Sequence, residues 1–113
     1  MSDTGIFLSA TRSAGDQAGV FEHDGATGYF YLYHANEKTN RKVVASIQIF
    51  PGSTDLTERE ISIRWSSAEN AVGLFIRGQL WAAFDLRSGA KYGGNYRPSA
   101  QPEIPIEVSE TFK

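Results

Sequence analysis

The chain has 113 residues, of which 41% are hydrophobic and 21% charged, a composition typical of one ordinary globular domain. The formal net charge of −2 lacks the basic excess of a nucleic-acid-binding protein, and the absence of cysteine excludes disulfides, thiolate catalysis and cysteine-ligated zinc. We therefore expect a single domain over residues 1–113, with 1–18 and 99–113 as the parts attached most loosely.

The N-terminal residues and the lack of long apolar runs indicate the cellular compartment of the protein. Residues 1–5 have neither the basic region nor the apolar region of a signal peptide. No apolar run approaches the ~18 residues that a membrane-spanning helix needs. Because a chain without cysteine also suits a reducing compartment, we expect a cytoplasmic protein that does not bind membranes.

The first half of the chain is expected to form strands joined by polar turns. Apolar runs at residues 6–8 and 19–22 are followed by a turn centred on Asp24-Gly25 and by a strand at 28–34. The alternation of that strand puts three tyrosines on one face and mainly apolar residues on the other: Tyr29, Tyr31 and Tyr33 against Phe30, Leu32 and His34. The next strand, at 43–50, ends at a proline, which cannot donate to a ladder.

The second half is dominated by a hairpin at residues 70–87, with a tight turn at 77–79. A strand at 61–66 precedes this hairpin, with Ile61, Ile63 and Trp65 facing inward. Strict alternation divides the hairpin into an inward set, Val72, Leu74, Ile76, Leu80, Ala82, Phe84 and Leu86, and an outward set, Gly73, Phe75, Arg77, Trp81, Ala83 and Asp85. The alternation therefore predicts that two large aromatic residues face away from the core.

After residue 88 the apolar pattern becomes irregular, and three prolines exclude a central strand or a long helix. Residues 104–108 alternate again, so this stretch is either a last edge strand or a tail draped over the sheet. No segment has a sustained 3.6-residue apolar period. The chain is therefore expected to be all-β, an antiparallel meander of about six to eight strands forming a sandwich or an open barrel, with little helix.

The aromatic residues on the outward faces are the main candidates for function. Large exposed aromatics bordered by charge commonly mark a recognition surface, and tyrosine, tryptophan and arginine are enriched among interface hot spots. In a sandwich or a dimer, however, the same side chains can simply fill a second core. The candidate binding residues are Tyr29, Tyr31, Tyr33, Arg64, Phe75, Arg77, Trp81 and Asp85.

Catalytic and metal-binding signatures are not found. The two histidines, His23 and His34, are 11 residues apart, and without cysteine they fall short of a zinc-binding set. The sequence has no Gly-x-Ser-x-Gly elbow, and its paired glycines do not lie between a strand and a helix as in a phosphate-binding loop. We therefore expect no cofactor, no metal and no nucleic-acid partner, and the sequence favours a non-catalytic role over an enzyme.

Two stretches carry a resemblance to a known group. F-E-H-D-G-A-T-G-Y-F-Y, residues 21–31, together with V-G-L-F-I-R-G-Q-L-W-A-A-F-D, residues 72–85, resembles small bacterial proteins grouped as a domain of unknown function. The resemblance extends over most of the chain, from about Gly19 to Pro98. It implies a compact bacterial β-domain and supplies no activity.

These observations lead to one main hypothesis and two alternatives. The chain is predicted to be a non-catalytic module that binds another protein through its aromatic sheet face, in the manner of an immunity-like inhibitor. The first alternative is a β-barrel that holds a small ligand, or a hydrolase-like enzyme, with an internal pocket that uses His34 and the tyrosines. The second is a homodimer built on the same aromatic face, with a second copy of the chain as the partner.

Overall fold

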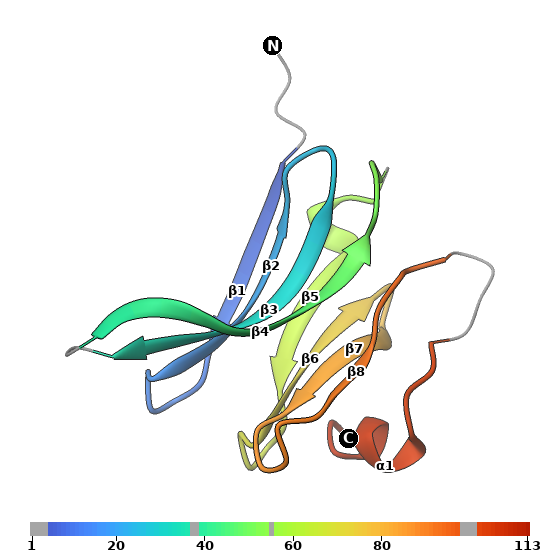
Figure 1. The fold of residues 1–113 in the computed structure, drawn as a ribbon. Helices are drawn as coiled ribbons and strands as arrows, with labels where there is room; N and C mark the ends of the chain where they lie inside the picture. The colour runs from blue at the N-terminus through green and yellow to red at the C-terminus, as the bar shows by residue number, and fades with distance from the viewer. Residues whose placement is uncertain (1–4, 37–38, 55, 98–101) are drawn as a thin grey trace.

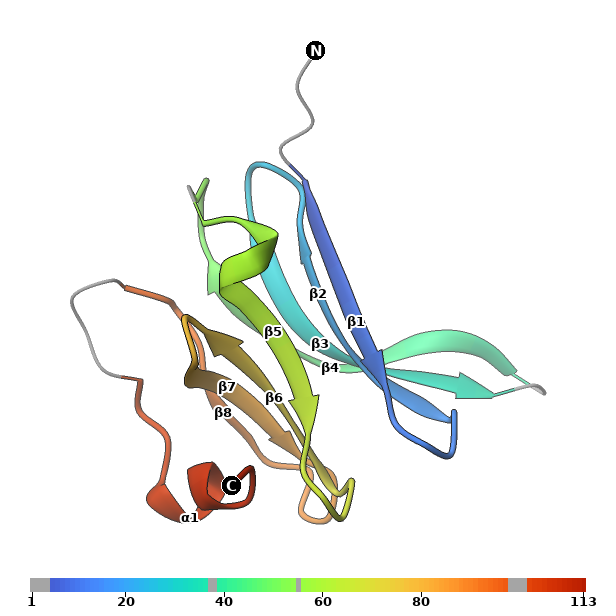
Figure 2. The ribbon, with the colours of Figure 1, turned by 180° about the vertical axis from the view of Figure 1, so that it is seen from behind.

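The strands form two four-stranded antiparallel sheets that face each other (Figures 1 and 2). This computed structural model describes residues 5–36, 39–54, 56–97 and 102–113. The first sheet contains β1 (Ile6–Thr11), β2 (Gln17–His23), β3 (Gly28–Asn36) and β4 (Thr39–Phe50). The second contains β5 (Ile61–Trp65), β6 (Ala71–Ile76), β7 (Gln79–Asp85) and β8 (Lys91–Gly93). The prediction of an all-β meander is confirmed, and the strands form two sheets instead of a closed barrel.

Helix is scarce in the described part of the chain. A 3-10 turn, η1 (Glu58–Glu60), precedes β5, and a short α-helix, α1 (Ile106–Glu110), lies near the C-terminus. Residues 104–108 therefore do not form the edge strand that their alternation allowed. Pro105 explains the difference, since it stands at the helix N-cap and cannot donate a ladder hydrogen bond.

The core lies between the two sheets and contains the largest apolar side chains. Phe21, Phe30, Val72 and Leu74 are fully buried there. The sheets approach closely at Gly19, where a Cβ atom would lie only 2.7 Å from Cγ2 of Val72. Burial of such side chains is the main source of stability for a domain without disulfides.

The hairpin of β6 and β7 contains a bulge that overturns part of the predicted alternation. Arg77 and Gly78 have φ values of 54° and 81°, as a two-residue hairpin turn requires. The register then shifts, because Leu74 pairs with Ala82 while Phe75 pairs with Leu80. One extra residue, Trp81, is thereby inserted into β7. The shift turns Trp81 into the core and Leu80 outward, the opposite of the predicted orientation for both.

The C-terminal segment, residues 102–113, covers the outer face of the second sheet. Side chains from this segment pack against a small apolar cluster on the sheet, with Ile104, Val108 and Phe112 against Phe75, Leu80 and Ala83. As a result all six residues of β6 are buried, those facing the core and those facing out. How firmly either end of the chain is attached stays a prediction.

A polar network ties the β1–β2 turn to the β5–β6 turn across the two sheets. The Arg12 guanidinium donates from Nε and Nη2 to the two carboxylate oxygens of Asp16, at 2.7 and 2.8 Å, and from Nη1 to the backbone oxygen of Glu69 at 3.0 Å. The Glu69 carboxylate in turn accepts the Ser13 backbone N–H at 3.0 Å. The charge-assisted, two-point bond between Arg12 and Asp16 lies within the β1–β2 turn and orients the guanidinium, while the bonds to Glu69 join this turn to the β5–β6 turn.

This network predicts an acid-sensitive contribution to stability. The hydrogen bond from Arg12 lowers the pKa of Asp16 to about 2, against about 3.9 in an unfolded chain. Because the folded pKa is the lower one, the contribution is complete above about pH 4 and is lost as the pH falls toward about 2. We expect the destabilisation caused by Asp16→Asn, measured by urea unfolding, to shrink progressively over that range. A difference from wild type that stays constant between about pH 6 and pH 2.5 would contradict this assignment.

Candidate functional site

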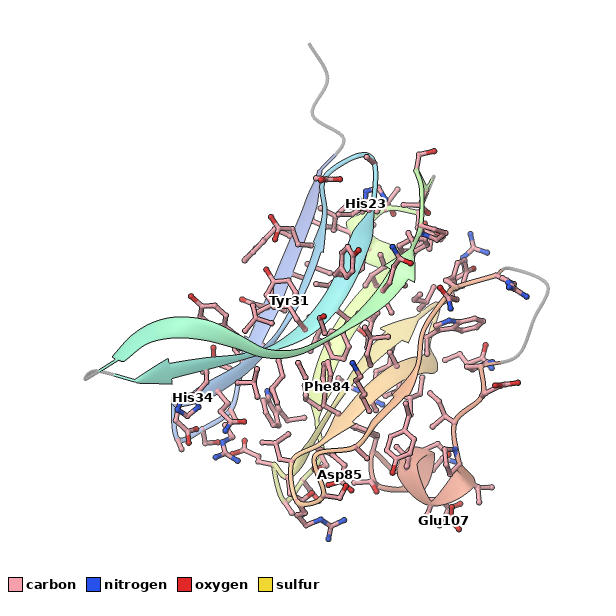
Figure 3. The ribbon with its side chains drawn as sticks, in the orientation of Figure 1. His23, Tyr31, His34, Phe84, Asp85 and Glu107 are labelled. Carbon is pink, nitrogen blue, oxygen red and sulfur yellow. The ribbon has the colours of Figure 1, made fainter. Side chains whose placement is uncertain are left out.

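The outer face of the first sheet carries the three predicted tyrosines. Along β3, Phe30 and Leu32 are buried in the core, while Tyr29, Tyr31 and Tyr33 point to the opposite side. Tyr29 is 39% exposed, and Tyr31, near the middle of the sheet, is half-buried among its neighbours (Figure 3). The prediction that these rings share a face away from the core is confirmed by their burial pattern.

The first depression on this face spans β1, β2 and β3 and has a volume of about 400 Å³. Its lining is mainly apolar, with Phe7 at one side and Tyr31 and Tyr33 at the other. Val20 lies between them and is 5% exposed, so it forms the floor. An open apolar depression of this kind can accept an apolar side chain of a partner.

The second depression, of about 380 Å³, adjoins the first because both are lined by Tyr31. Tyr29, Val43 and two acidic residues, Glu22 and Asp24, form the rest of its wall. The two acidic residues lie at one end of β2 and in the turn that follows it. Apolar and acidic groups are thus side by side on one sheet face.

Hydrogen bonds hold the polar groups of the second depression in place. The Tyr31 hydroxyl donates to Oε1 of Glu22 at 2.9 Å, and burial together with this bond raises the pKa of Tyr31 to about 12. Oδ1 of Asp24 accepts the backbone N–H groups of Ala26 and Thr27, both at 2.9 Å, and these bonds lower the pKa of Asp24. Near neutral pH, Tyr31 therefore remains a hydroxyl donor and Asp24 remains ionised.

The other predicted binding residues do not join this face. Trp81 is 3% exposed and Phe75 is 6% exposed, so their predicted outward exposure is wrong. The bulge turns Trp81 into the core, and the C-terminal segment covers Phe75. The three charged candidates also lie on the second sheet or its turns. The guanidinium carbon of Arg64 lies 4.2 Å from the centre of the Phe75 ring, and Nε of Arg77 donates to Oε2 of Glu60 at 2.8 Å. Oδ1 of Asp85 accepts the backbone N–H of Arg87 at 2.9 Å.

Comparison with known proteins places the chain in a family. Residues 2–110 match the model of DUF2251, an uncharacterised protein family conserved in bacteria. The chain belongs to this family. An uncharacterised protein of Haemophilus influenzae is 28% identical over 111 residues, a match that covers 88% of this chain and 66% of the relative, so the chain spans just under two thirds of that protein's length. No solved structure matches significantly.

The family assignment confirms the resemblance inferred from the sequence and adds no activity to this DUF2251 chain. None of the helices in the described part of the chain is long and apolar enough to cross a lipid bilayer. Within the same described ranges, no group of three or more His, Asp or Glu side chains is placed to hold a metal ion.

The outer face of the first sheet, with Tyr29, Tyr31 and Tyr33, is called the tyrosine face. Two residues that were not predicted from the sequence enlarge this face of the DUF2251 chain. Phe7 is 60% exposed between the inward residues Ile6 and Leu8, and this alternation was a usable signal. Val43 is 50% exposed because a register shift between Leu32 and Tyr33 places it opposite Tyr33, on the outer face. Strict alternation along β4 would put Val43 on the same side as Ala45 and Ile47, and the register shift could not be read from the sequence.

The two histidines lie at opposite ends of the first sheet (Figure 3). His34 pairs with Gln17 in the β2–β3 ladder. His23 is 2% exposed and accepts the Gly25 backbone N–H at Nδ1, at 3.0 Å. Its Nε2 therefore carries the proton and donates to the Gly52 carbonyl, at 2.9 Å. Both ring nitrogens of His23 are used inside the fold, so this histidine has a structural role.

Proposed function

We propose that this chain is a non-catalytic protein-binding module of the bacterial cytoplasm, which uses the outer face of its first sheet. The single observation that carries the proposal is the difference between the two sheets. The outer face of the second sheet is covered by the chain's own C-terminal segment, whereas the first sheet exposes Phe7, Tyr29 and Val43. Grouped, exposed apolar side chains of this kind favour a contact with another macromolecule.

The geometry of the face supports a polypeptide partner. Tyr31 separates the two depressions and is held by its bond to Glu22, so little side-chain freedom would be lost on binding. An apolar side chain of the partner fits the first depression, and a donor or cationic side chain suits the carboxylates of the second. Masking the active surface of another bacterial protein, as an immunity-like inhibitor does, is one form that such binding takes.

The two alternatives receive less support. Phe21, Phe30 and Val72 fill the space between the sheets, so we do not propose a ligand inside a barrel. A homodimer on the tyrosine face would use the same residues as a protein partner. Sedimentation distinguishes this homodimer from a complex with another protein.

The test compares capture of proteins from a bacterial extract by tagged wild type and by the double variant Phe7→Ala, Tyr31→Ala. We expect a partner that wild type retains and the double variant loses, with an affinity lowered about 30-fold or more when the purified partner is titrated. Ile106→Ala is the matched control, because Ile106 is 68% exposed and lies in the C-terminal segment, away from the tyrosine face. This control should retain the partner.

Two further measurements complete this test. Thermal unfolding of the double variant checks that it is folded before its binding is interpreted. Sedimentation tests the second-copy alternative: a wild-type dimer that the double variant converts to a monomer would make the partner another copy of the chain. A double variant that retains every captured protein, and sediments like wild type, would overturn the proposal.

A further inference from the structure

The second sheet carries an apolar contact that the proposed function does not use. We call Gly73, Phe75, Leu80 and Ala83 on its outer face the docking face. The C-terminal segment places Ile104, Val108 and Phe112, four residues apart, against it. The ring of Phe112 meets Phe75 edge-on, with centroids 5.6 Å apart and planes at 85°. This edge-to-face arrangement is the preferred geometry for two aromatic rings.

Gly73 shapes the docking face for the ring of Phe112. A Cβ atom at position 73 would lie 2.6 Å from Cδ1 of Leu80 and 2.9 Å from Cζ of Phe112. Both distances are shorter than carbon atoms tolerate, so a side chain at position 73 forces the end of the Leu80 side chain, the ring of Phe112 or both to move. The absence of a side chain at position 73 therefore leaves room on the docking face for the ring of Phe112.

The C-terminal segment is attached through its side chains. Among the described residues, the backbone hydrogen bonds of 105–113 run within the segment itself, as from Val108 to Pro105 at 3.0 Å and from Thr111 to Val108 at 3.1 Å. No residue of α1 is buried. Leaving the docking face thus exposes apolar surface without breaking any of these hydrogen bonds.

We propose that the docking face also binds the C-terminal segment of a second copy of this chain, so that two chains exchange residues 102–113. The contacts in the exchanged pair are the same as in the single chain, because the same segment meets the same face. Attachment within one chain acts as an effective concentration in the millimolar range, so single chains dominate in dilute solution. Exchange needs none of the tyrosine-face residues and is therefore independent of the function proposed above.

A complementation experiment tests this exchange. Phe112→Ala weakens the contact of the C-terminal segment with the docking face and leaves the face itself intact. Gly73→Ala crowds the docking face where the ring of Phe112 lies and leaves the segment intact. Each variant alone should sediment as a monomer, and an equimolar mixture should form a 1:1 pair. In the matched control Gly73→Ala is mixed with Ile106→Ala, whose own segment keeps its three docking side chains, and this mixture should remain monomeric. A complementary mixture that stays monomeric up to about millimolar concentration would overturn the proposal.

A second measurement does not depend on the folding of Gly73→Ala. A fluorescent peptide with the sequence of residues 102–113 is titrated into wild type and into folded Phe112→Ala. We expect at least about tenfold tighter binding to Phe112→Ala, because in wild type the chain's own segment competes for the face. A peptide that itself carries Phe112→Ala should not bind. Failure of the unmodified peptide to bind the folded variant would also overturn the proposal.

Discussion

Replacing Trp81 by alanine should lower the free energy of unfolding by about 3–5 kcal/mol, the range for removing a large aromatic side chain from a core. Trp81 is 3% exposed, and its ring contacts Tyr96 with centroids 4.7 Å apart. Its Nε1 donates to the Gly94 carbonyl at 3.1 Å. The variant would therefore lose a packing contact and leave a carbonyl without its donor. Urea unfolding followed by far-UV circular dichroism measures the change.

The control for this prediction is Phe7→Ala on the first sheet. Phe7 is 60% exposed, so its removal should change the free energy of unfolding by no more than about 0.5 kcal/mol. Similar, small effects for Trp81→Ala and Phe7→Ala would mean that Trp81 faces solvent, as strict alternation along the hairpin predicts. Such a result would contradict the bulge in β7.

His23→Ala should be comparably destabilising, by about 3–5 kcal/mol. The imidazole is 2% exposed, and its ring meets Phe50 edge-on with centroids 5.6 Å apart. Alanine would leave a cavity against Phe50 and remove the partners of the Gly25 N–H and the Gly52 carbonyl. Thermal and urea unfolding at neutral pH measure the loss.

Two further substitutions at His23 separate packing from hydrogen bonding. His23→Phe keeps most of the ring volume and leaves both backbone groups unpaired, whereas His23→Asn can place an oxygen where Nδ1 accepts the Gly25 N–H. We expect both variants to be more stable than His23→Ala and less stable than wild type. A His23→Ala variant as stable as wild type would exclude a structural role for this ring.

The sequence predicts local structure well where one short-range rule governs it. Alternation along residues 28–34 correctly separates the tyrosines from Phe30 and Leu32, because adjacent side chains of a strand point to opposite faces. A tight turn is predicted at residues 77–79, and the structure places it at Arg77 and Gly78, with Gln79 already in β7.

The same rule fails where the ladder contains an extra residue. Trp81 and Val43 both lie beside register shifts, and each faces the side opposite to the one that alternation predicts. A bulge depends on how two strands fit each other and the layer behind them, so no pattern within one strand reveals it. Because of these register shifts, the sequence correctly predicted only Tyr29, Tyr31 and Tyr33 among the residues of the candidate site. It assigned Trp81 to a surface that the fold does not have.

The sequence by itself determined the strands from β1 to β7, the main turns and the outward direction of Tyr29, Tyr31 and Tyr33, since these depend on neighbours within a few residues. Only the tertiary structure decided which sheet face is free. Phe75 and Tyr31 both point away from the core, yet the C-terminal segment covers the first and no described segment covers the second. Burial depends on what distant parts of the chain pack against a residue, and that separates a second apolar cluster from a candidate binding surface.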